Sequence, residues 1–287
     1  IDRGHTGGGT FFVESEPQFL DIKKKYFGNV VKVSKYIEHS KSLTINGCIY
    51  KNKVFWGPVQ EQFTGINGLT NNKGTTVGND WNFSVFLYSD LKNKIIEILQ
   101  KVSDVLIYKK YRGLFGIDLL IDIENYSVYL LEINARQTAN IPMETKLFLK
   151  HDLIPLSLIH LCEFLEIDIE KELECVNPYE FYNFDASQLF LRSKSKCLIN
   201  QKIQSGIYEI NKDNQKINIK FINKYEYDIS KIDYPEFILS AFSQGEIRDI
   251  NEEIARIQIN KSLSNNSELF STITAFLSSF NNYLQSL

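Results

Sequence analysis

The amino-acid sequence predicts an α+β fold in two parts, a larger N-terminal domain and a smaller C-terminal domain that also contains strands. Two observations define the first part: β-prone runs flank a long amphipathic helix, and two neighbouring β-branched runs form a hairpin. The third observation is that a region of shorter strands begins at Asn177-Pro178. We therefore expect the first domain to span residues 1–165 and the second to span residues 178–287.

The composition is that of an ordinary globular protein. The chain has 287 residues, of which 43% are hydrophobic and 23% charged, so it can bury a substantial core. Its 32 basic and 35 acidic residues are interspersed and leave a formal net charge of −3, which disfavours nucleic acid as a partner. No apolar run approaches the ~20 residues that cross a bilayer, so we also expect no membrane partner.

The cysteine pattern argues against both a disulfide framework and a zinc site. The four cysteines are scattered without the close spacing that metal ligands or small disulfide-rich folds use. A reducing cytoplasm is the location that fits this usage. The cysteines are Cys48, Cys162, Cys175 and Cys197.

The chain opens with a glycine-rich loop, Gly4-His5-Thr6-Gly7-Gly8-Gly9-Thr10, that leads into the β-prone run 11–13. This order differs from a dinucleotide-binding turn, in which the glycines open a helix. Such loops normally follow a strand, whereas this chain begins at Ile1, so we expect native sequence to be missing upstream. A helix near 16–25 and a strand at 30–37 are expected next.

The middle of the chain alternates strands with helices. Residues 43–50 and 53–59 read as strands joined by a turn at Asn52. From the N-cap residue Ser89, apolar residues recur at the spacing of one buried helix face, and we expect this helix to end near residue 109. Residues 147–165 are expected to be helical as well. The recurring apolar residues are Leu91, Ile95, Leu99, Val102 and Leu106.

The last third predicts further strands at 186–192, 206–210 and 217–223. Residues 247–263 show a renewed helix-like apolar periodicity. A stretch rich in serine and asparagine at 262–267 then separates them from a final helix that ends near Leu287.

The hairpin of residues 114–134 carries the most informative polar pattern. With a loop of residues 124–126, counting back along the two strands places Asp118 directly across from Glu132. Because side chains alternate along a strand, Asn134 and Asp122 lie on the same face. Two opposed carboxylates repel each other unless a cation neutralises them.

Two carboxylates and an amide oxygen form a hard oxygen ligand set of the kind that holds Mg²⁺ and leaves positions for phosphate oxygens and water. We therefore predict Asp118, Glu132 and Asn134 as metal ligands, with Mg²⁺ as the metal and Mn²⁺ as a substitute. The alternative is a solvated strand face whose carboxylates oppose each other by chance, and a register error of one residue would remove the argument.

The segments Gly116-Ile117-Asp118 and Glu132-Ile133-Asn134-Ala135-Arg136 resemble the signature of the ATP-grasp superfamily, in particular its biotin-carboxylase-like and carbamoyl-phosphate-synthase-like ligases. That signature has an acidic residue on one strand and Glu-x-Asn on the next, often followed by an arginine. The resemblance implies an ATP-grasp fold over the first domain, with ATP as the cofactor and Asp118, Glu132 and Asn134 as magnesium ligands.

Three more segments follow the order that the family requires. The glycine-rich loop from Gly4 to Thr10 is similar to the mobile flap over the ATP phosphates, where backbone amides bind phosphate oxygens. The run Val33 to Glu38 is similar to the hinge that receives adenine, which implies nucleotide contacts at Lys35, Tyr36 and Ile37. Gln60 lies in a segment similar to one in which a glutamine approaches the nucleotide or the acceptor.

Two arginines are implied in catalysis. Members usually carry a phosphate-contacting lysine just before the flap, whereas Ile1-Asp2-Arg3 stand here, so either Arg3 takes its place or the lysine lies upstream. Arg136 corresponds to a residue that binds the acceptor carboxylate or an acylphosphate; the plainer reading is a surface ion pair. Thr138, Asn140 and Glu144 follow on the loop that lines the acceptor site in the family.

The resemblance implies an ATP-dependent ligase that joins a small carboxylate to an amine through an acylphosphate, with an amino acid or small peptide as substrate. Two alternatives stay open: an ATP-grasp kinase or carboxylase, and a non-catalytic nucleotide-binding subunit. A homodimer is compatible with each of these functions. The histidines show no catalytic pattern, and no GxSxG elbow is present.

Overall fold

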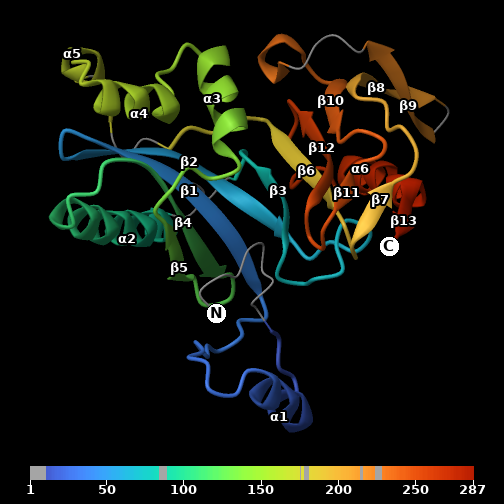
Figure 1. Ribbon diagram of the computed structural model, residues 1–287. Coiled ribbons are helices and arrows are strands. Elements are labelled where there is room, and N and C mark those ends of the chain that lie inside the picture. The colour runs from blue at the N-terminus through green and yellow to red at the C-terminus, as the bar shows by residue number, and fades with distance from the viewer. Residues whose placement is uncertain (1–10, 84–88, 175, 178–180, 214–215, 224–227) are drawn as a thin grey trace.

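The computed structural model describes residues 11–83, 89–174, 176–177, 181–213, 216–223 and 228–287, and its centre is one large antiparallel sheet (Figure 1). The strands of this sheet are β1 (Ser40–Tyr50), β2 (Lys53–Thr64), β3 (Thr76–Asp80), β4 (Gly113–Asp122), β5 (Ser127–Asn134), β6 (Ser187–Arg192), β8 (Gly206–Asp213), β9 (Lys216–Asn223), β10 (Glu236–Ala241) and β12 (Glu253–Ile259). A smaller sheet contains β7 (Cys197–Ile199), β11 (Ile247–Arg248) and β13 (Leu284–Ser286).

Helices pack on both faces of the large sheet, except α1 (Glu16–Lys25), which buries no residue and lies away from the sheet (Figure 1). The others are α2 (Ser89–Tyr108), α3 (Ile141–Lys150), α4 (Leu156–Leu165), α5 (Glu170–Leu173) and α6 (Ser267–Ser279), with short 3-10 helices η2 (Ile229–Lys231) and η3 (Phe280–Tyr283). Among these described helices, none combines the length and the apolar character that crossing a bilayer requires.

The spatial order of the ten strands is β5-β4-β1-β2-β3-β6-β12-β10-β8-β9. Strand β3 of the expected first domain pairs with β6 of the expected second domain, so one sheet runs through both. A shared sheet does not locate a domain boundary, so the division between residues 165 and 178 stays a prediction. Strand β5, which carries Glu132 and Asn134, lies at one edge of the sheet.

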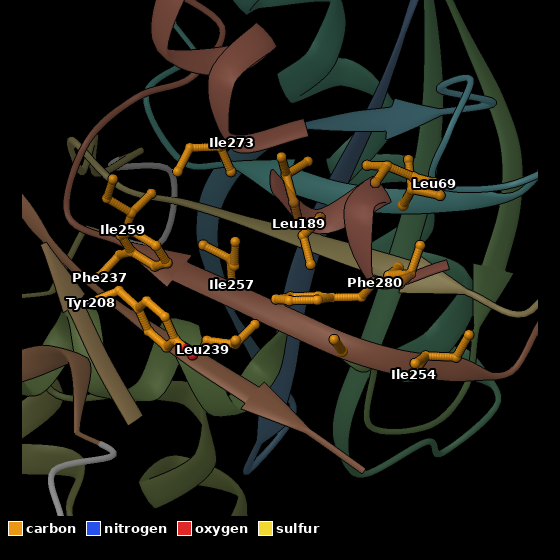
Figure 2. Close-up of a cluster of buried hydrophobic side chains, with 14 of the residues drawn as sticks. Leu69, Leu189, Tyr208, Phe237, Leu239, Ile254, Ile257, Ile259, Ile273 and Phe280 are labelled. Atoms are coloured by element: carbon orange, nitrogen blue, oxygen red, sulfur yellow. The ribbon is translucent and has the colours of Figure 1, made fainter. Parts of the chain in front are cut away.

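One face of the sheet is covered by α2 at one end and by α6 at the other. The predicted stripe of α2, which includes Ile95 and Leu99, is buried against Leu43 and Ile117 of β1 and β4. At the other end, Ile273 of α6 packs with Leu189 and Ile257, as Figure 2 shows. Each fully buried side chain of this kind contributes about 1.5–3 kcal/mol.

The opposite face is covered only in part. Helix α4 packs over the ends of β1 and β4 through Ile159 and Cys162, and α3 packs near β3 through Met143 against Trp81. Between these contacts and the free edge at β5, the face presents polar side chains. This uncovered region contains the residues predicted to bind a metal.

Several predicted elements are confirmed. Lys51 and Asn52 join β1 to β2, and both have positive φ angles, 45° and 62°, which the tight two-residue hairpin turn requires. The strands at 43–50 and 53–59, the helix from Ser89 and the strand at 186–192 are also present.

Other predicted elements are wrong. Residues 30–37 form no strand, because they lie exposed beside no pairing partner within the described ranges; Val30 is 93% exposed. The predicted helix at 147–165 is two helices, α3 and α4, which are separated at Pro155. Residues 247–263 form β11 and β12 rather than a helix, because alternating residues pack between β6 and β10.

Candidate functional site

The predicted carboxylates lie across from each other on the partly uncovered face. In the register of β4 and β5, Asp118 pairs with Glu132, and Gly116 pairs with Asn134. Asp118 is half-buried and Glu132 is exposed. The facing arrangement that the sequence predicts is therefore present.

The register reaches this pairing by a different route from the predicted one. At the turn, Asp122 rather than Ile123 pairs with Ser127, so the loop is one residue longer than expected. The register then shifts between Asp118 and Leu119, because Leu131 is an extra residue in the β5 strand. The longer loop and the bulge offset each other, and the carboxylates face each other after all.

Asp118 accepts hydrogen bonds from three strands. Thr44 Oγ1 on β1 donates to Asp118 Oδ1 at 2.6 Å, and Gln62 Nε2 on β2 donates to the same oxygen at 2.8 Å. Asn134 Nδ2 lies between the two carboxylates, 3.1 Å from Asp118 Oδ2 and 2.9 Å from Glu132 Oε1. These bonds fix Asp118 on the sheet face.

The pair is electrostatically strained. The pKa of Asp118 is raised to about 6; burial is the largest cause, the neighbouring Glu132 carboxylate adds to it, and hydrogen bonds from Thr44 and Asn134 oppose it. A carboxylate that resists ionisation because another faces it is a group that a bound cation would stabilise.

Asp122 does not join the pair. Its Oδ1 accepts the backbone N–H groups of Glu124 and Asn125, at 3.0 and 3.1 Å, and its Oδ2 accepts the Asn125 side chain. The Asn125 bonds are the main cause that lowers its pKa. Asp122 therefore closes the hairpin turn.

Arg136 lies directly beside the predicted metal ligands. Its Nη2 donates to Asn134 Oδ1 at 3.3 Å, and its Nη1 donates to the Gln137 carbonyl at 3.1 Å. The residue is exposed, so the guanidinium can meet a ligand that approaches from solvent.

The predicted hinge passes close to the same hairpin. Lys32 Nζ lies 3.4 Å from the Leu131 carbonyl at the bulge, and Lys35 contributes to the low pKa of Asp122. Tyr36 contacts the Phe12 ring edge-on at 5.8 Å, and the Ile37 carbonyl accepts a bond from Ser40. Lys35 thus lies near the turn of the hairpin, and Tyr36 and Ile37 follow it in a segment without regular structure.

Two groups of predicted residues lie outside the described ranges. They are Arg3 and the glycine-rich loop Gly4, His5, Thr6, Gly7, Gly8, Gly9 and Thr10. Their contacts with a nucleotide remain predictions.

Gln60 belongs to a buried polar group that we call the amide cluster, which consists of Asn46, Gln60, Thr138, Asn140 and Glu144. Glu144 Oε2 accepts bonds from Asn46 Nδ2 at 2.7 Å and from Gln60 Nε2 at 2.6 Å. Asn140 Nδ2 donates to Gln60 Oε1 at 2.5 Å. Burial raises the pKa of Glu144 to about 8, against hydrogen bonds that favour its charged form.

Arg112 and Trp81 lie away from the pair. Arg112 Nε donates to Glu163 Oε1 at 2.6 Å, so this arginine connects β4 to α4. Trp81 is fully buried, and Asp80 next to it accepts the backbone N–H groups of Asn82, Leu263 and Ser264. His151 and His160 pack against aromatic rings, and His39 faces solvent.

Sequence reasoning missed Thr44, Gln62 and Asn46 as site neighbours. All three are polar residues at alternate positions of the otherwise apolar strands β1 and β2. Strand alternation places Thr44 and Asn46 on one face, so this pattern could have revealed them. What the sequence lacks is the pairing of β1 between β2 and β4.

The donor set suits a hard divalent cation. Asp118 and Glu132 supply carboxylate oxygens, and rotation of the Asn134 amide would supply a third oxygen. Within the described ranges no group of three or more histidine, cysteine, aspartate or glutamate side chains gathers to hold a metal. Two carboxylates and one amide oxygen leave coordination positions for water or phosphate oxygens, as Mg²⁺ requires.

Comparison with solved structures establishes the fold. The biotin carboxylase domain of a single-chain bacterial carboxylase is similar with a TM-score of 0.55 and 9% identity, over 91% of this chain and 52% of that chain. The Staphylococcus aureus N5-carboxyaminoimidazole synthetase complexed with ADP has a TM-score of 0.49 and 14% identity, over 85% and 52%. The Hydrogenobacter thermophilus 2-oxoglutarate carboxylase biotin carboxylase domain, in complex with MgADP, ADP and bicarbonate, has a TM-score of 0.49 and 10% identity, over 79% and 43%.

The chain therefore has the predicted α+β ATP-grasp fold, and its resemblance to biotin-carboxylase-like members is confirmed at the level of the fold. No family model matches the sequence, and no curated protein is similar to it. The chain spans about half, or less, of the length of the three solved structures.

Proposed function

We propose that this chain binds Mg·ATP at the β4–β5 hairpin and forms the nucleotide-binding and C-terminal part of an ATP-dependent carboxylate-amine ligase. The single observation that carries the proposal is the facing of Asp118 and Glu132, with Asn134 between them. Two opposed carboxylates on an open sheet face cost stability unless a cation lies between them.

The metal ligands would be Asp118, Glu132 and Asn134. A magnesium ion held there supplies positive charge to the phosphate oxygens and to the charge that develops during phosphoryl transfer. Thr44 and Gln62 hold Asp118 through its Oδ1, which leaves Oδ2 directed toward Glu132 and Asn134. The protein thus fixes the first ligand before any nucleotide binds.

The remaining contacts follow the hairpin. Backbone groups at Lys35, Tyr36 and Ile37 would pair with adenine, and the glycine-rich loop with Arg3 would cover the phosphates. Arg136 would bind the acceptor carboxylate or the acylphosphate through its planar guanidinium. Its position beside Asn134 supports this role, because both would then meet at the transferred phosphate.

The proposed reaction has two steps. An oxygen of the substrate carboxylate bonds to the γ-phosphorus of ATP while the bond to the β-phosphate oxygen breaks, and ADP leaves. An amine nitrogen then bonds to the acyl carbon, loses a proton, and phosphate leaves. Little side-chain acid-base chemistry is required, because positioning and charge stabilisation lower the barrier.

Calorimetric titration with ATP, with and without Mg²⁺, tests nucleotide binding. We expect wild type to bind ATP in Mg²⁺, and Asp118→Asn and Glu132→Gln to weaken this binding about 100-fold, which is ~2.7 kcal/mol. The matched control is Glu124→Gln, an exposed carboxylate at the turn of the same hairpin. Equal affinity in all four proteins would reject the site.

Release of ADP with pools of acids and amines tests ligation. The proposal predicts product only when a carboxylate and an amine are both present. Turnover with an alcohol would identify a kinase, and turnover with bicarbonate a carboxylase. Binding of Mg·ATP without turnover on any acceptor would favour a non-catalytic nucleotide-binding subunit.

A further inference from the structure

The loop that carries Arg136 is tied down by the amide cluster rather than by its own secondary structure. Residues 135–140 run from the end of β5 to the start of α3, and Arg136 is exposed. Thr138 Oγ1 donates to Asn46 Oδ1 on β1 at 2.6 Å and also contacts Asn140 Oδ1. The loop therefore folds back over the sheet through its polar side chains.

Two glycines make room for this arrangement. A Cβ atom at Gly116 of β4 would lie 2.5 Å from Thr138 Cγ2, so Thr138 lies directly over the strand that carries Asp118. A Cβ atom at Gly57 of β2 would lie 2.6 Å from Glu144 Oε1. Real Cβ contacts are longer than this, so the close fit of loop and helix onto the sheet depends on both glycines.

Asn140 gives a second sign that the cluster fixes the loop. It is the N-cap residue of α3, yet its side chain makes no capping bond to the helix. Here the side chain instead donates to Gln60 Oε1 and accepts from Asn46 Nδ2 at 3.3 Å, so the helix start is held by the sheet.

Glu144 is the centre of these bonds. It is 2% exposed and lies in the first turns of α3, where Asn46 and Gln60 both converge on its Oε2. The Trp81 indole also favours its charged form, although neither Trp81 Nε1 nor Glu144 Oε1 makes a well-directed hydrogen bond within the described residues. Glu144 is nearly inaccessible to solvent and, within the described residues, makes no hydrogen bond to the predicted metal ligands, so it acts through other residues.

We infer that Glu144 is a positioning residue that, through the amide cluster, fixes the loop 135–140 and so holds Arg136 beside Asn134. The restraint on the loop is independent of ligand chemistry. The benefit for acceptor binding rests on the proposed function, because it requires Arg136 to meet the carboxylate or acylphosphate.

Limited trypsin digestion of the whole chain tests the restraint, because the Arg136–Gln137 bond lies in the loop. We expect Thr138→Val and Glu144→Gln to raise the rate of cleavage after Arg136 about 10-fold, measured by mass spectrometry under native conditions. This change equals ~1.4 kcal/mol of easier local opening. Thr138→Val keeps the methyl group over Gly116 and removes only the hydroxyl.

Three controls separate positioning from general stability. Cleavage after Lys110, in the turn that follows α2, should stay at the wild-type rate in both variants. Glu163→Gln, a buried glutamate on α4 that binds Arg112, should not change cleavage after Arg136. Thr138→Ser keeps the hydroxyl and should retain the wild-type rate after Arg136.

Unchanged cleavage after Arg136 in both variants would overturn the inference. So would an equal rise after Arg136 and Lys110, because that result reports general unfolding. If Glu144→Gln does not fold, Thr138→Val alone decides. Mg·ATP binding is measured separately in wild type, so failure of the proposed function would leave the cleavage comparison intact.

Discussion

The two carboxylate sites on this sheet face differ in exposure, in neighbouring charge and in hydrogen-bond partners. At the hairpin, Asp118 and Glu132 oppose each other at an open surface, and no lysine or arginine is bonded to either one among the described residues. In the amide cluster, Glu144 is alone, buried and surrounded by neutral amides. The first site offers a place for a cation from outside, whereas at the second the protein donates two hydrogen bonds to Glu144 Oε2 and none to Oε1 within the described residues.

The difference shows how environment assigns a role to an acid. Two carboxylates that repel each other at an accessible position can bind a metal, because the cation neutralises their negative charge. A carboxyl group with buried amide donors is stabilised in place and cannot reach a ligand. We therefore assign metal binding to the pair and positioning to Glu144.

The largest expected difference between the sites is in pH dependence. In the unfolded chain the pKa of Glu144 has the ordinary value of 4.5, and burial raises it to about 8 in the folded protein. The proton is bound more tightly in the folded state, so this stabilisation is complete below pH 4.5 and is lost as the pH rises toward 8. The loss is about 5 kcal/mol at most, at 1.36 kcal/mol per pKa unit.

Urea unfolding of wild type and Glu144→Gln from pH 4 to pH 9 measures this loss. The stability of the variant should change less over that range. Because Asp118 titrates in both proteins, its contribution cancels in the difference. Parallel curves for the two proteins would show that Glu144 does not bind its proton more tightly on folding.

A second prediction concerns loss of the whole acid from the amide cluster. Glu144→Ala leaves two buried amide donors, Asn46 Nδ2 and Gln60 Nε2, without the acceptor that they share. We expect a cost of roughly 3 kcal/mol in the free energy of unfolding, measured by urea titration near pH 5. A cost below ~1 kcal/mol would mean that the cluster does not depend on Glu144.

A third prediction tests the close approach of the loop to the hairpin. Gly116→Ala should cost about 1–3 kcal/mol, because the new Cβ meets Thr138 Cγ2. Thr138→Ser removes that methyl group and keeps the hydroxyl, so the double variant should recover much of the loss in a double-mutant cycle. Additive effects of the two changes would contradict the contact.

The smallest effect should have the opposite sign. Glu132→Gln removes the repulsion from Asp118, so in the absence of divalent cations it should stabilise the chain by under about 1 kcal/mol. The matched change at the exposed turn residue Glu124 should not stabilise it. Thermal unfolding in a chelator measures both, and destabilisation by Glu132→Gln would show that the pair is compensated by the protein alone.

The pairing of Asp118 with Glu132 could be predicted from the sequence, but the reasoning contained two errors that offset each other. The loop is one residue longer than counted, and the Leu131 bulge restores the register. Neither has a readable signal, because bulges arise from pairing with a neighbouring strand. The order of the ATP-grasp-like segments predicted the fold class more securely than counting residues along the hairpin did.

The amide cluster could not be predicted as a unit. Its bonds join Glu144 to Asn46 across 98 positions and to Gln60 across 84 positions. Such contacts follow from strand order, which the sequence does not state. The predicted strand at 30–37 failed for a related reason: β-branched residues form a strand only where a neighbouring strand and a buried face are available.

The most direct test of the central claim is Mn²⁺ binding, because electron paramagnetic resonance counts free and bound ions without a substrate. Wild type and Glu124→Gln should bind one Mn²⁺ ion at the pair, and Mg²⁺ should displace it. Asp118→Asn and Glu132→Gln should each weaken that binding at least about 10-fold. Equal Mn²⁺ binding by all four proteins would contradict the assignment of Asp118, Glu132 and Asn134 as a metal site.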